Sequence, residues 1–296
     1  SMAVLDVLRG AVSERCVPAM LGHAAATGRV VLGVWEEPQP GLLLGRFHAT
    51  AEEGTARRRH TGGRAVPVGP DHVRVALALP HRSALESDDP SALRPEQAMN
   101  RCVRGLLGAL RVLGTDAFYP GRDVVTAAGA PIAWLSIGEE ESGATLFDAG
   151  LHVATIPAAP REDGEAAVLG AYRSRPWSTV GDLDVERLPE ARPPDLSWTI
   201  PPGADREGAV PTMLGSLRAH VGVDGARRLA VVRISGDVIA PVATVRALEA
   251  ALAGVPALRG EIERALDGAL REDARRWVLG IDAPRDVAAA VMEALR

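Results

Sequence analysis

Apolar residues along the chain form short continuous runs and longer runs spaced as on one face of a helix. The short runs at residues 30–35, 41–47 and 72–79 predict strands. A turn that contains Pro and Gly separates the first two runs, which predicts a hairpin. Residues 95–114 carry apolar side chains at helical spacing, with Pro95 suited to a first turn and Gly114 to a stop.

Two further runs, at residues 123–137 and 144–156, also predict strands. Strands and helices therefore mix along the first half of the chain. This pattern indicates an α+β fold built around a mixed or mostly antiparallel sheet.

A proline-rich stretch separates this part from the C-terminal part. Residues 186–208 hold five prolines and many charges, which is typical of a connector. Alternation across residues 213–237 predicts a hairpin around Asp224 and Gly225. Three helices are then predicted at 244–255, 258–270 and 284–296, with Thr244 and Asp282 as caps. We expect a domain over 1–190, a linker over 191–207 and an accessory domain over 208–296.

The composition of the chain argues against several classes of protein. The 296 residues are 47% apolar and 24% charged, with net charge −5, which argues against broad nucleic-acid binding. No apolar run approaches the ~20 residues of a membrane span, and no secretion signal is visible. Cys16 and Cys102 give neither a disulfide framework nor metal spacing. We expect a cytoplasmic protein with buried structural thiols and no metal site.

All 33 basic residues in the sequence are arginine. High Ala, Gly, Arg and Pro content is typical of a GC-rich genome, which explains this bias. Its chemical consequence holds whatever the cause. A Schiff-base lysine, a P-loop lysine and a lysine clamp on an acyl-adenylate are all excluded, because a planar guanidinium does not replace a compact ammonium.

The densest cationic stretch is ARRRHTGGRAV, residues 56–66. Glycines allow close backbone approach and positive φ. Arginine forks bind phosphate or carboxylate, and clustered backbone N–H groups cradle anions. The stretch therefore predicts a loop for an anionic ligand, although a tight Gly-Gly turn with solvated arginines has the same sequence.

Four segments carry a resemblance to lipoate–protein ligases. RRHTGGRAV (58–66) resembles the family's signature loop, Arg-Arg-x-Ser/Thr-Gly-Gly-Gly/Arg-Ala-Val. LLLGRF (42–47) is similar to the strand that ends in Gly-Arg-Phe, GRDVV (121–125) to the Asn-Asp strand, and residues 231–254 to the accessory domain. The matches keep the family's order and span most of the chain.

The resemblance implies a mixed-sheet biotin/lipoate-ligase-like domain with a smaller α+β C-terminal accessory domain. It implies ATP with Mg²⁺ as cofactor, lipoate or octanoate as substrate, and a lipoyl-domain protein as acceptor, with no nucleic-acid or membrane partner. On this sequence the implied ligand-binding residues are Arg58, Arg59, Thr61, Gly62, Gly63, Arg64, Ala65, Arg122, Asp123, Pro131 and Trp134. We expect Arg58, Arg59, Gly62 and Gly63 to border the main pocket of the first domain.

Several site positions depart from the family's pattern. The family's lysine falls on Pro131, the glycine of the same segment on Trp134, the Asn before Asp123 on Arg122, and a histidine on Val68. Cys102 lies well before the cysteine of the family's cysteine-dependent acyltransferases. A tryptophan at 134 is expected to fill part of the acyl tunnel.

We therefore expect a ligase-like protein that binds an acyl group or acyl-adenylate, with its ligase chemistry altered or lost and no catalytic residue assigned. Two alternatives stay open. One is an active ligase or acyltransferase in which Arg122 or Arg64 supplies the missing charge. The other is a non-enzymatic binding or scaffold protein.

Overall fold

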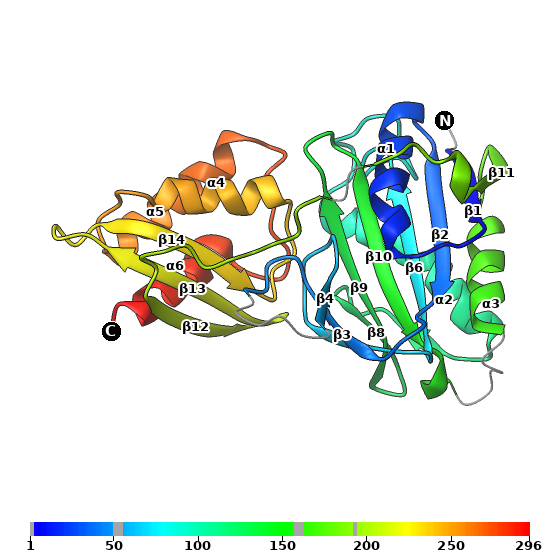
Figure 1. Cartoon of the computed structure of the whole chain (residues 1–296), viewed down its shortest axis with the longest axis horizontal. Helices are drawn as coiled ribbons and strands as arrows, with labels where there is room; N and C mark the ends of the chain where they lie inside the picture. Colours follow the sequence, from blue (N-terminus) through cyan, green and yellow to red (C-terminus); the bar gives the residue numbers. More distant parts are fainter. Residues whose placement is uncertain (1–2, 50–55, 157–162, 192–193) are drawn as a thin grey trace. The chain divides into compact units, whose positions relative to one another are not determined.

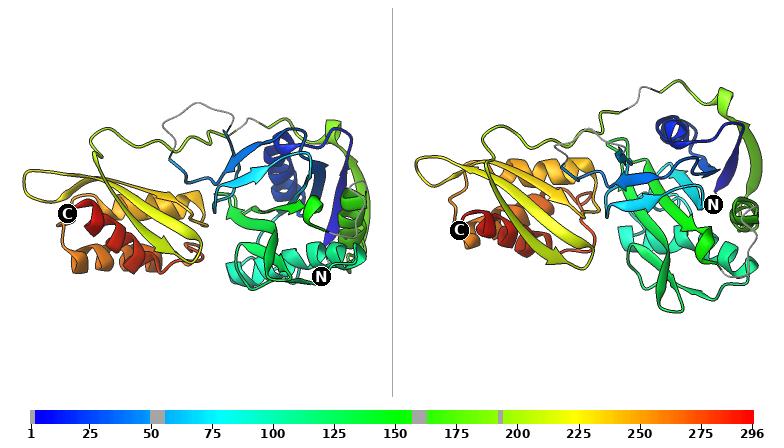
Figure 2. Two further views of the ribbon diagram at one scale, coloured as in Figure 1. Left: turned by 90° about the horizontal axis from the view of Figure 1, so that it is seen from below. Right: turned by 60° about the horizontal axis from the view of Figure 1, so that its bottom comes forward.

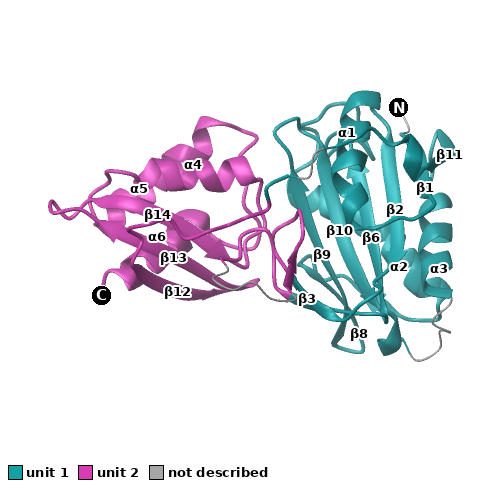
Figure 3. Ribbon diagram, viewed as in Figure 1, with its two compact units in different colours: residues 1–43, 66–195 teal, residues 44–65, 196–296 magenta. Residues whose placement is uncertain are grey.

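The computed structural model describes residues 3–49, 56–156, 163–191 and 194–296, and it divides into two compact units (Figure 3). Unit 1 comprises residues 1–43 and 66–195, and unit 2 comprises residues 44–65 and 196–296. Unit 2 thus takes a segment from the first half of the chain, the one that contains most of the arginine-rich loop. The domain bounds given above stay a prediction, and residues 192 and 193 of the expected linker lie outside the described residues.

Unit 1 is built on an eight-stranded sheet of order β11-β1-β2-β6-β10-β9-β8-β7 (Figure 1). Its first strand pairs in parallel with β2 and β11, whereas the other pairs are antiparallel, so the predicted mixed sheet and α+β class are confirmed. The strands are β1 (Val4–Arg9), β2 (Val30–Glu36), β6 (His72–Leu79), β7 (Ala117–Phe118), β8 (Val124–Ala127), β9 (Ala130–Glu139), β10 (Thr145–His152) and β11 (Thr179–Asp184).

Helices cover both faces of this sheet (Figure 1). On one face α1 (Val17–Thr27) packs on apolar residues of β2, β6 and β10. On the other lie α2 (Pro95–Val112) and α3 (Asp163–Arg173). Short 3-10 helices span Glu14–Cys16, Val153–Thr155 and Val185–Arg187.

The two cysteines are free and buried, as predicted. Cys102 lies in α2 beneath α3, where its carbonyl oxygen accepts a hydrogen bond of 2.8 Å from the Tyr172 hydroxyl. Burial raises the pKa of the Cys102 thiol to about 12. Because the thiolate is the reactive form, Cys102 is a structural residue.

The predicted hairpin between residues 30–35 and 41–47 is wrong. Strand β2 already pairs with β1 on one side and with β6 on the other. With both edges occupied it has no free edge for the next run. That run forms β3 (Gly41–Leu44), which pairs instead with β5 (Val66–Val68) in a small separate sheet.

Unit 2 is a three-stranded antiparallel sheet with three helices on one face (Figures 1 and 2). The strands are β12 (Arg206–Thr212), β13 (Gly215–Val223) and β14 (Leu229–Gly236), and the helices are α4 (Val242–Leu252), α5 (Arg259–Glu272) and α6 (Ala283–Ala294). Leu217, Ala219 and Val221 of β13 belong to the apolar core shared with the helices. Strand alternation directs the residues between them to the opposite face.

The sequence predicted this unit well, apart from one cap. The hairpin turns at Asp224, whose carboxylate accepts the N–H groups of Ala226 and Arg228. Thr244 lies inside α4, which begins after Pro241, so its predicted capping role is wrong. Asp282 is the N-cap residue of α6, without a side-chain capping bond in the described structure.

Among the described residues, no helix has the length and apolar character needed to cross a bilayer.

Candidate functional site

The glycines of the arginine-rich loop are required by contacts within unit 2. The Gly63 N–H donates to the Val238 carbonyl at 2.7 Å. A Cβ atom on Gly62 would lie 1.9 Å from that same carbonyl oxygen. A Cβ on Gly45 would lie 1.9 Å from the Gly63 carbonyl, and Gly63 itself has φ +88°. Only glycine fits such close backbone contacts, so the loop rests against the chain itself.

The loop arginines bind carbonyl oxygens of the chain. Arg58 Nη1 donates to the carbonyls of Gly45 and Arg46, each at 3.2 Å, and to that of His48. Burial, and then the charge of Arg46, lower the pKa of Arg58. Arg59 is 1% exposed and donates through Nε and Nη2 to the Gly62 carbonyl. These guanidinium groups fix the local fold of the loop.

The other loop residues follow the same pattern. Thr61 is buried, and its carbonyl accepts the Arg46 N–H at 2.9 Å. Arg64 and Ala65 are half-buried, and Arg64 Nη2 lies 3.5 Å from the Met213 carbonyl. The ligand-binding role of the loop stays a prediction.

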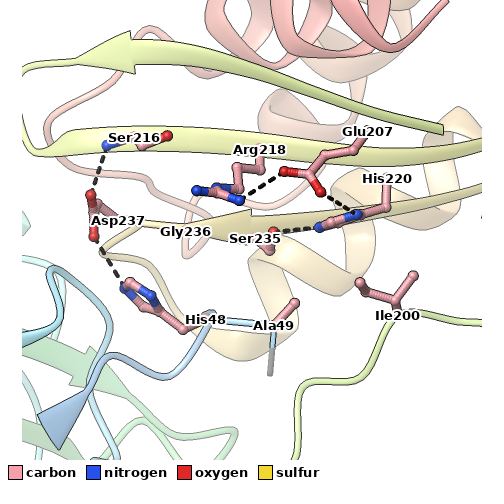
Figure 4. A pocket seen from close by; sticks show the side chains of 10 residues that line it. All are labelled: His48, Ala49, Ile200, Glu207, Ser216, Arg218, His220, Ser235, Gly236 and Asp237. Carbon is pink, nitrogen blue, oxygen red and sulfur yellow. Dashed lines mark hydrogen bonds and ion pairs between the residues drawn. The ribbon is translucent and has the colours of Figure 1, made fainter. Parts of the chain in front are cut away.

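The segment before the loop leads to a pocket of about 410 Å³ in unit 2 (Figure 4). Phe47 is buried edge-to-face on Trp198, with ring centroids 4.9 Å apart. His48 Nε2 lies 3.1 Å from both the Gly63 carbonyl and an Asp237 carboxylate oxygen. His48 and Asp237 line the pocket, whereas Arg58, Arg59, Gly62 and Gly63 do not.

The remaining predicted site residues lie in unit 1, around β8 and β9. Asp123 is buried just before β8, and its carbonyl accepts the Leu135 N–H at 2.9 Å. Arg122 and Pro131 are exposed. Trp134 is buried in β9 opposite Val124.

Asp123 and Trp134 point to opposite faces of the sheet. Asp123 precedes Val124, the partner of Trp134, so strand alternation directs the carboxylate to the other side. There it neighbours Tyr119, whose pKa is raised by burial and then by the Asp123 charge. The structure therefore does not bring these two predicted residues onto one surface.

The most unusual feature of the Trp134 face was missed by sequence reasoning. Trp35, Arg74, Gly150 and Trp134 lie side by side on β2, β6, β10 and β9. The Arg74 guanidinium lies 5.1 Å from the Trp35 ring centroid and 5.0 Å from that of Trp134. A Cβ on Gly150 would lie 2.4 Å from Trp134 Nε1, so the glycine makes room for the indole. Two rings thus flank one fully buried cation.

Three carboxylates surround the same guanidinium. Arg74 Nη2 lies 2.8 Å from Glu14 and 2.9 Å from Asp148, and Nη1 lies 3.3 Å from Glu37. Burial alone would lower the pKa of Arg74, but Asp148, Glu14 and Glu37 outweigh it and raise the pKa. Burial raises the pKa of Glu14; Arg74 opposes this shift, and Asp148 and Glu37 add to it. We call these six residues, Trp35 and Trp134 included, the Arg74 cluster.

A signal for the cluster was present in the sequence. Between Val73 and Leu79 the strand β6 is apolar on both faces except for Arg74. A charge inside such a strand requires partners, because burying an unpaired cation is very costly. Which carboxylates serve as partners depends on the sheet order, which the sequence does not give.

Apolar residues outside the eight-stranded sheet pack against one member of the cluster. Trp134 packs in an apolar group with Leu43, Val66 and Val68 of β3 and β5. Within the described part of the chain, no group of three or more His, Cys, Asp or Glu side chains is placed to hold a metal ion.

No protein-family model matches the chain, and no curated protein matches it either. A solved structure similar to it is that of LipL1 from P. falciparum in complex with lipoate, with 12% identity and a TM-score of 0.66 over 97% of this chain and 98% of that one. This likeness shows that the chain shares the fold of that structure.

Two further structures are more distant. A putative lipoate protein ligase from T. acidophilum has 16% identity, with 64% of this chain and 92% of that one covered and a TM-score of 0.47. Lipoate-protein ligase A bound with ATP has 18% identity, coverage of 58% and 82%, and a TM-score of 0.41. Similarity at this level adds nothing to the fold assignment.

Proposed function

We propose that the chain is a lipoate–protein ligase-like protein whose ATP-dependent ligase chemistry is altered or lost. The observation that carries this proposal is the Arg74 cluster. Trp134 occupies the position at which the resemblance places a glycine, and its indole lies over Gly150 beside Arg74. An acyl chain on this face would meet two indoles and a buried ion cluster.

Making room for an acyl chain on that face of the sheet would cost free energy, because ion pairs would have to break. Arg74 is fully buried and pairs with three carboxylates. Breaking a buried ion pair by removing one partner typically costs ~3–5 kcal/mol. A hydrophobic ligand offers no replacement for the lost charge contacts, so its binding would have to offset this cost. This supports altered or weakened binding of lipoate or octanoate.

The missing lysine supports the same proposal. Acyl adenylation builds negative charge on the phosphate and on the attacked carbonyl. Losing one fixed group that stabilises such charge costs about 10²–10³ in rate. Pro131 carries no charge and no backbone N–H, and it is exposed. No residue of the chain other than arginine can supply a permanent cation, since the sequence contains no lysine.

The residues that would receive ATP with Mg²⁺ fit that ligand poorly as they stand. In the arginine-rich loop, Gly62 and Gly63 are packed against the Val238 carbonyl, and Arg58 and Arg59 bind carbonyls of the chain. We therefore derive no step through the nucleotide. An acyl group or acyl-adenylate remains the proposed ligand, a lipoyl-domain protein the proposed acceptor, and the cytoplasm the proposed compartment, where the two free cysteines stay reduced.

The test is a lipoylation assay with purified protein, ATP, Mg²⁺, lipoate or octanoate, and a panel of lipoyl acceptor domains. We expect transfer at or near background. Calorimetry with the same acids and with ATP measures binding separately from chemistry. Transfer at the rate of an ordinary ligase, measured in parallel, would refute the loss of chemistry.

A variant sharpens this assay. Pro131→Lys returns a cation to the expected position, and Ala130→Lys, one residue away on the same strand, is its matched control. Restored acyl-adenylate formation in the first variant alone would indicate that the rest of the site is intact. If neither Pro131→Lys nor Ala130→Lys forms acyl-adenylate, the Arg74 cluster or the arginine-rich loop would be the cause of the lost activity.

One observation favours the alternative of an active ligase or acyltransferase. Arg122 is exposed directly beside the buried Asp123, so its guanidinium is available at the edge of that strand. If the wild-type protein is active, Arg122→Gln should reduce transfer. A protein that binds the acids without any transfer would instead be a non-enzymatic binding protein.

A further inference from the structure

The pocket of unit 2 lies on the face of the three-stranded sheet that the helices leave open (Figures 2 and 4). It has a volume of about 410 Å³, within the range of small-molecule sites. Its lining is mainly polar and comes from all three strands and from the segments at His48 and Ile200. The titratable residues in this lining are His48, Glu207, Arg218, His220 and Asp237.

Three of the lining side chains form a chain of contacts across the strands. Ser235 Oγ lies 3.0 Å from His220 Nε2. The other ring nitrogen, His220 Nδ1, lies 3.8 Å from a Glu207 carboxylate oxygen. Figure 4 shows the three in this order, with the imidazole between the hydroxyl and the carboxylate.

The sheet register explains why they meet. His220 on β13 is directly opposite Glu207 on β12 and opposite Arg233 on β14. Ser235 follows Arg233 by two residues, so it lies on the same face one step along. The three groups therefore come from regular strands, which hold side chains more precisely than loops do.

We propose that Ser235, His220 and Glu207 are the nucleophile, the general base and the orienting carboxylate of a serine hydrolase site for small carboxylic esters. This goes beyond the ligase-like role and does not depend on it. The arrangement meets the general criterion for an activated serine, which is a base within hydrogen-bond reach and a third group behind that base. The 3.8 Å contact is long, as such contacts often are in the absence of substrate.

The protonation of His220 suits this role. Burial lowers its pKa; Glu207 opposes the shift, and Arg218 and Arg233 add to it. His220 is 4% exposed, and the lowered pKa favours the neutral imidazole, which is the form that can accept a proton. With its proton on Nδ1 toward Glu207, Nε2 is the acceptor that faces the Ser235 hydroxyl.

The reaction balances with water as the second reactant. Ser235 Oγ bonds to the ester carbonyl carbon, and its proton moves to His220 Nε2. The bond from carbon to the alcohol oxygen breaks, and the alcohol takes that proton. Water then attacks the acyl-serine, its proton passes to His220, and the bond to Oγ breaks as Ser235 regains a proton and the carboxylic acid leaves.

Charge on the oxyanion needs a donor in the same pocket. Arg218 lines the pocket and donates through Nη1 to Glu207 at 2.8 Å. Its guanidinium carries several N–H donors in a fixed plane. We assign Arg218 to this position, since it brings a permanent positive charge next to the nucleophile and its base.

The decisive experiment uses the wild-type protein. It is incubated with a fluorophosphonate probe, which reacts with activated serine hydroxyls, and the labelled peptide is located by mass spectrometry. Labelling of Ser235 supports the proposal. Labelling at another serine only, or none at all, overturns it. Hydrolysis of 4-nitrophenyl acetate is followed in parallel as the kinetic readout.

Variants separate catalysis from packing. Ser235→Ala should abolish labelling and hydrolysis above background. Ser174→Ala, an exposed serine of unit 1 outside the pocket, is the control and should be labelled and hydrolyse the ester like wild type. His220→Gln should lower the rate by about 10²–10⁴. Hydrolysis that persists in Ser235→Ala contradicts the proposal.

Glu207 is a positioning residue, and its variant needs a different readout. Glu207→Gln keeps the shape of the side chain and removes its charge, which should lower kcat and shift the acidic limb of the pH–rate profile to lower pH. An unchanged profile would remove Glu207 from the assignment. Circular dichroism of every variant checks that unit 2 remains folded.

Discussion

The arginines of the loop and the single arginine Arg74 have different structural roles. In unit 2, Arg58 and Arg59 belong to a dense cationic stretch and bind carbonyl oxygens of neighbouring turns. In unit 1, Arg74 is isolated in an apolar strand and gathers three carboxylates and two indoles. The arginine-rich stretch binds nearby backbone carbonyls, whereas Arg74 gathers side chains from three other strands, β2, β9 and β10, from Glu37 just after β2, and from the 3-10 helix that begins at Glu14.

The difference follows from where each arginine is placed. In the loop and the segment before it, backbone carbonyls lie within reach of the guanidinium groups, 3 residues away in sequence for Arg59 and 10–13 for Arg58, and they accept hydrogen bonds from them. Inside a sheet the carbonyls are already paired in the ladder, so a buried guanidinium must find carboxylates on other strands. Charge density along a sequence is therefore a weaker guide to a site than charge in an apolar strand.

Among the substitutions considered, removal of the Arg74 guanidinium is expected to cause the largest loss of stability. Arg74→Ala leaves three carboxylates close together and removes the cation that lies between two indoles, so we expect a loss of ~3–5 kcal/mol in the free energy of unfolding. Urea denaturation measures it. Arg9→Ala, which removes an exposed pair with Asp182, is the matched control and should cost at most about 1 kcal/mol. Equal losses in both variants would contradict the comparison.

The second effect concerns the glycines of the loop. Gly62→Ala forces a Cβ to 1.9 Å from the Val238 carbonyl oxygen, so the backbone must shift. We expect a loss of ~1–3 kcal/mol, the usual cost of overpacking. The control is Gly225→Ala, in the hairpin turn of the same unit, where a Cβ meets nothing within 4 Å. A neutral Gly62→Ala would show that the loop is not held against Val238.

The strands and helices were the most predictable part of the structure. The run at 72–79 coincides with β6, and the three C-terminal helices and the hairpin at Asp224 lie where their patterns place them. These features depend on local periodicity and turn chemistry, which a single sequence contains. The hairpin after β2 failed because strand partners are chosen by the whole sheet.

The candidate site was less predictable for the same reason. The resemblance drew attention to Trp134, but Arg74, Gly150 and Asp148 meet it only through the order β2-β6-β10-β9. His220 and Ser235 lie 15 residues apart and meet across a hairpin. Their pairing required the exact register, and a shift of one residue would have placed them on opposite faces.

The smallest effect is a change of stability with pH, and it tests the electrostatics of the Arg74 cluster. The pKa of Glu14 is raised in the folded protein by burial, with Asp148 and Glu37 adding to the shift and Arg74 opposing it. A raised folded-state pKa means that the protonated carboxyl is favoured by folding. Its contribution to stability is fully present below the unfolded-state pKa and is lost as pH rises through the folded-state pKa.

Glu14→Gln removes this dependence, because glutamine keeps the hydrogen-bonding shape but does not titrate. The stability of the variant relative to wild type should therefore increase as pH rises from 4 to 7, measured by urea denaturation at several pH values. Glu263→Gln, in the exposed pair with Arg259 on α5, controls for the loss of a carboxylate outside the cluster. A relative stability of Glu14→Gln that falls with pH would mean that attraction to Arg74 exceeds burial at Glu14. The cluster would then be held together by charge at neutral pH, and Arg74 would be harder for any ligand to displace.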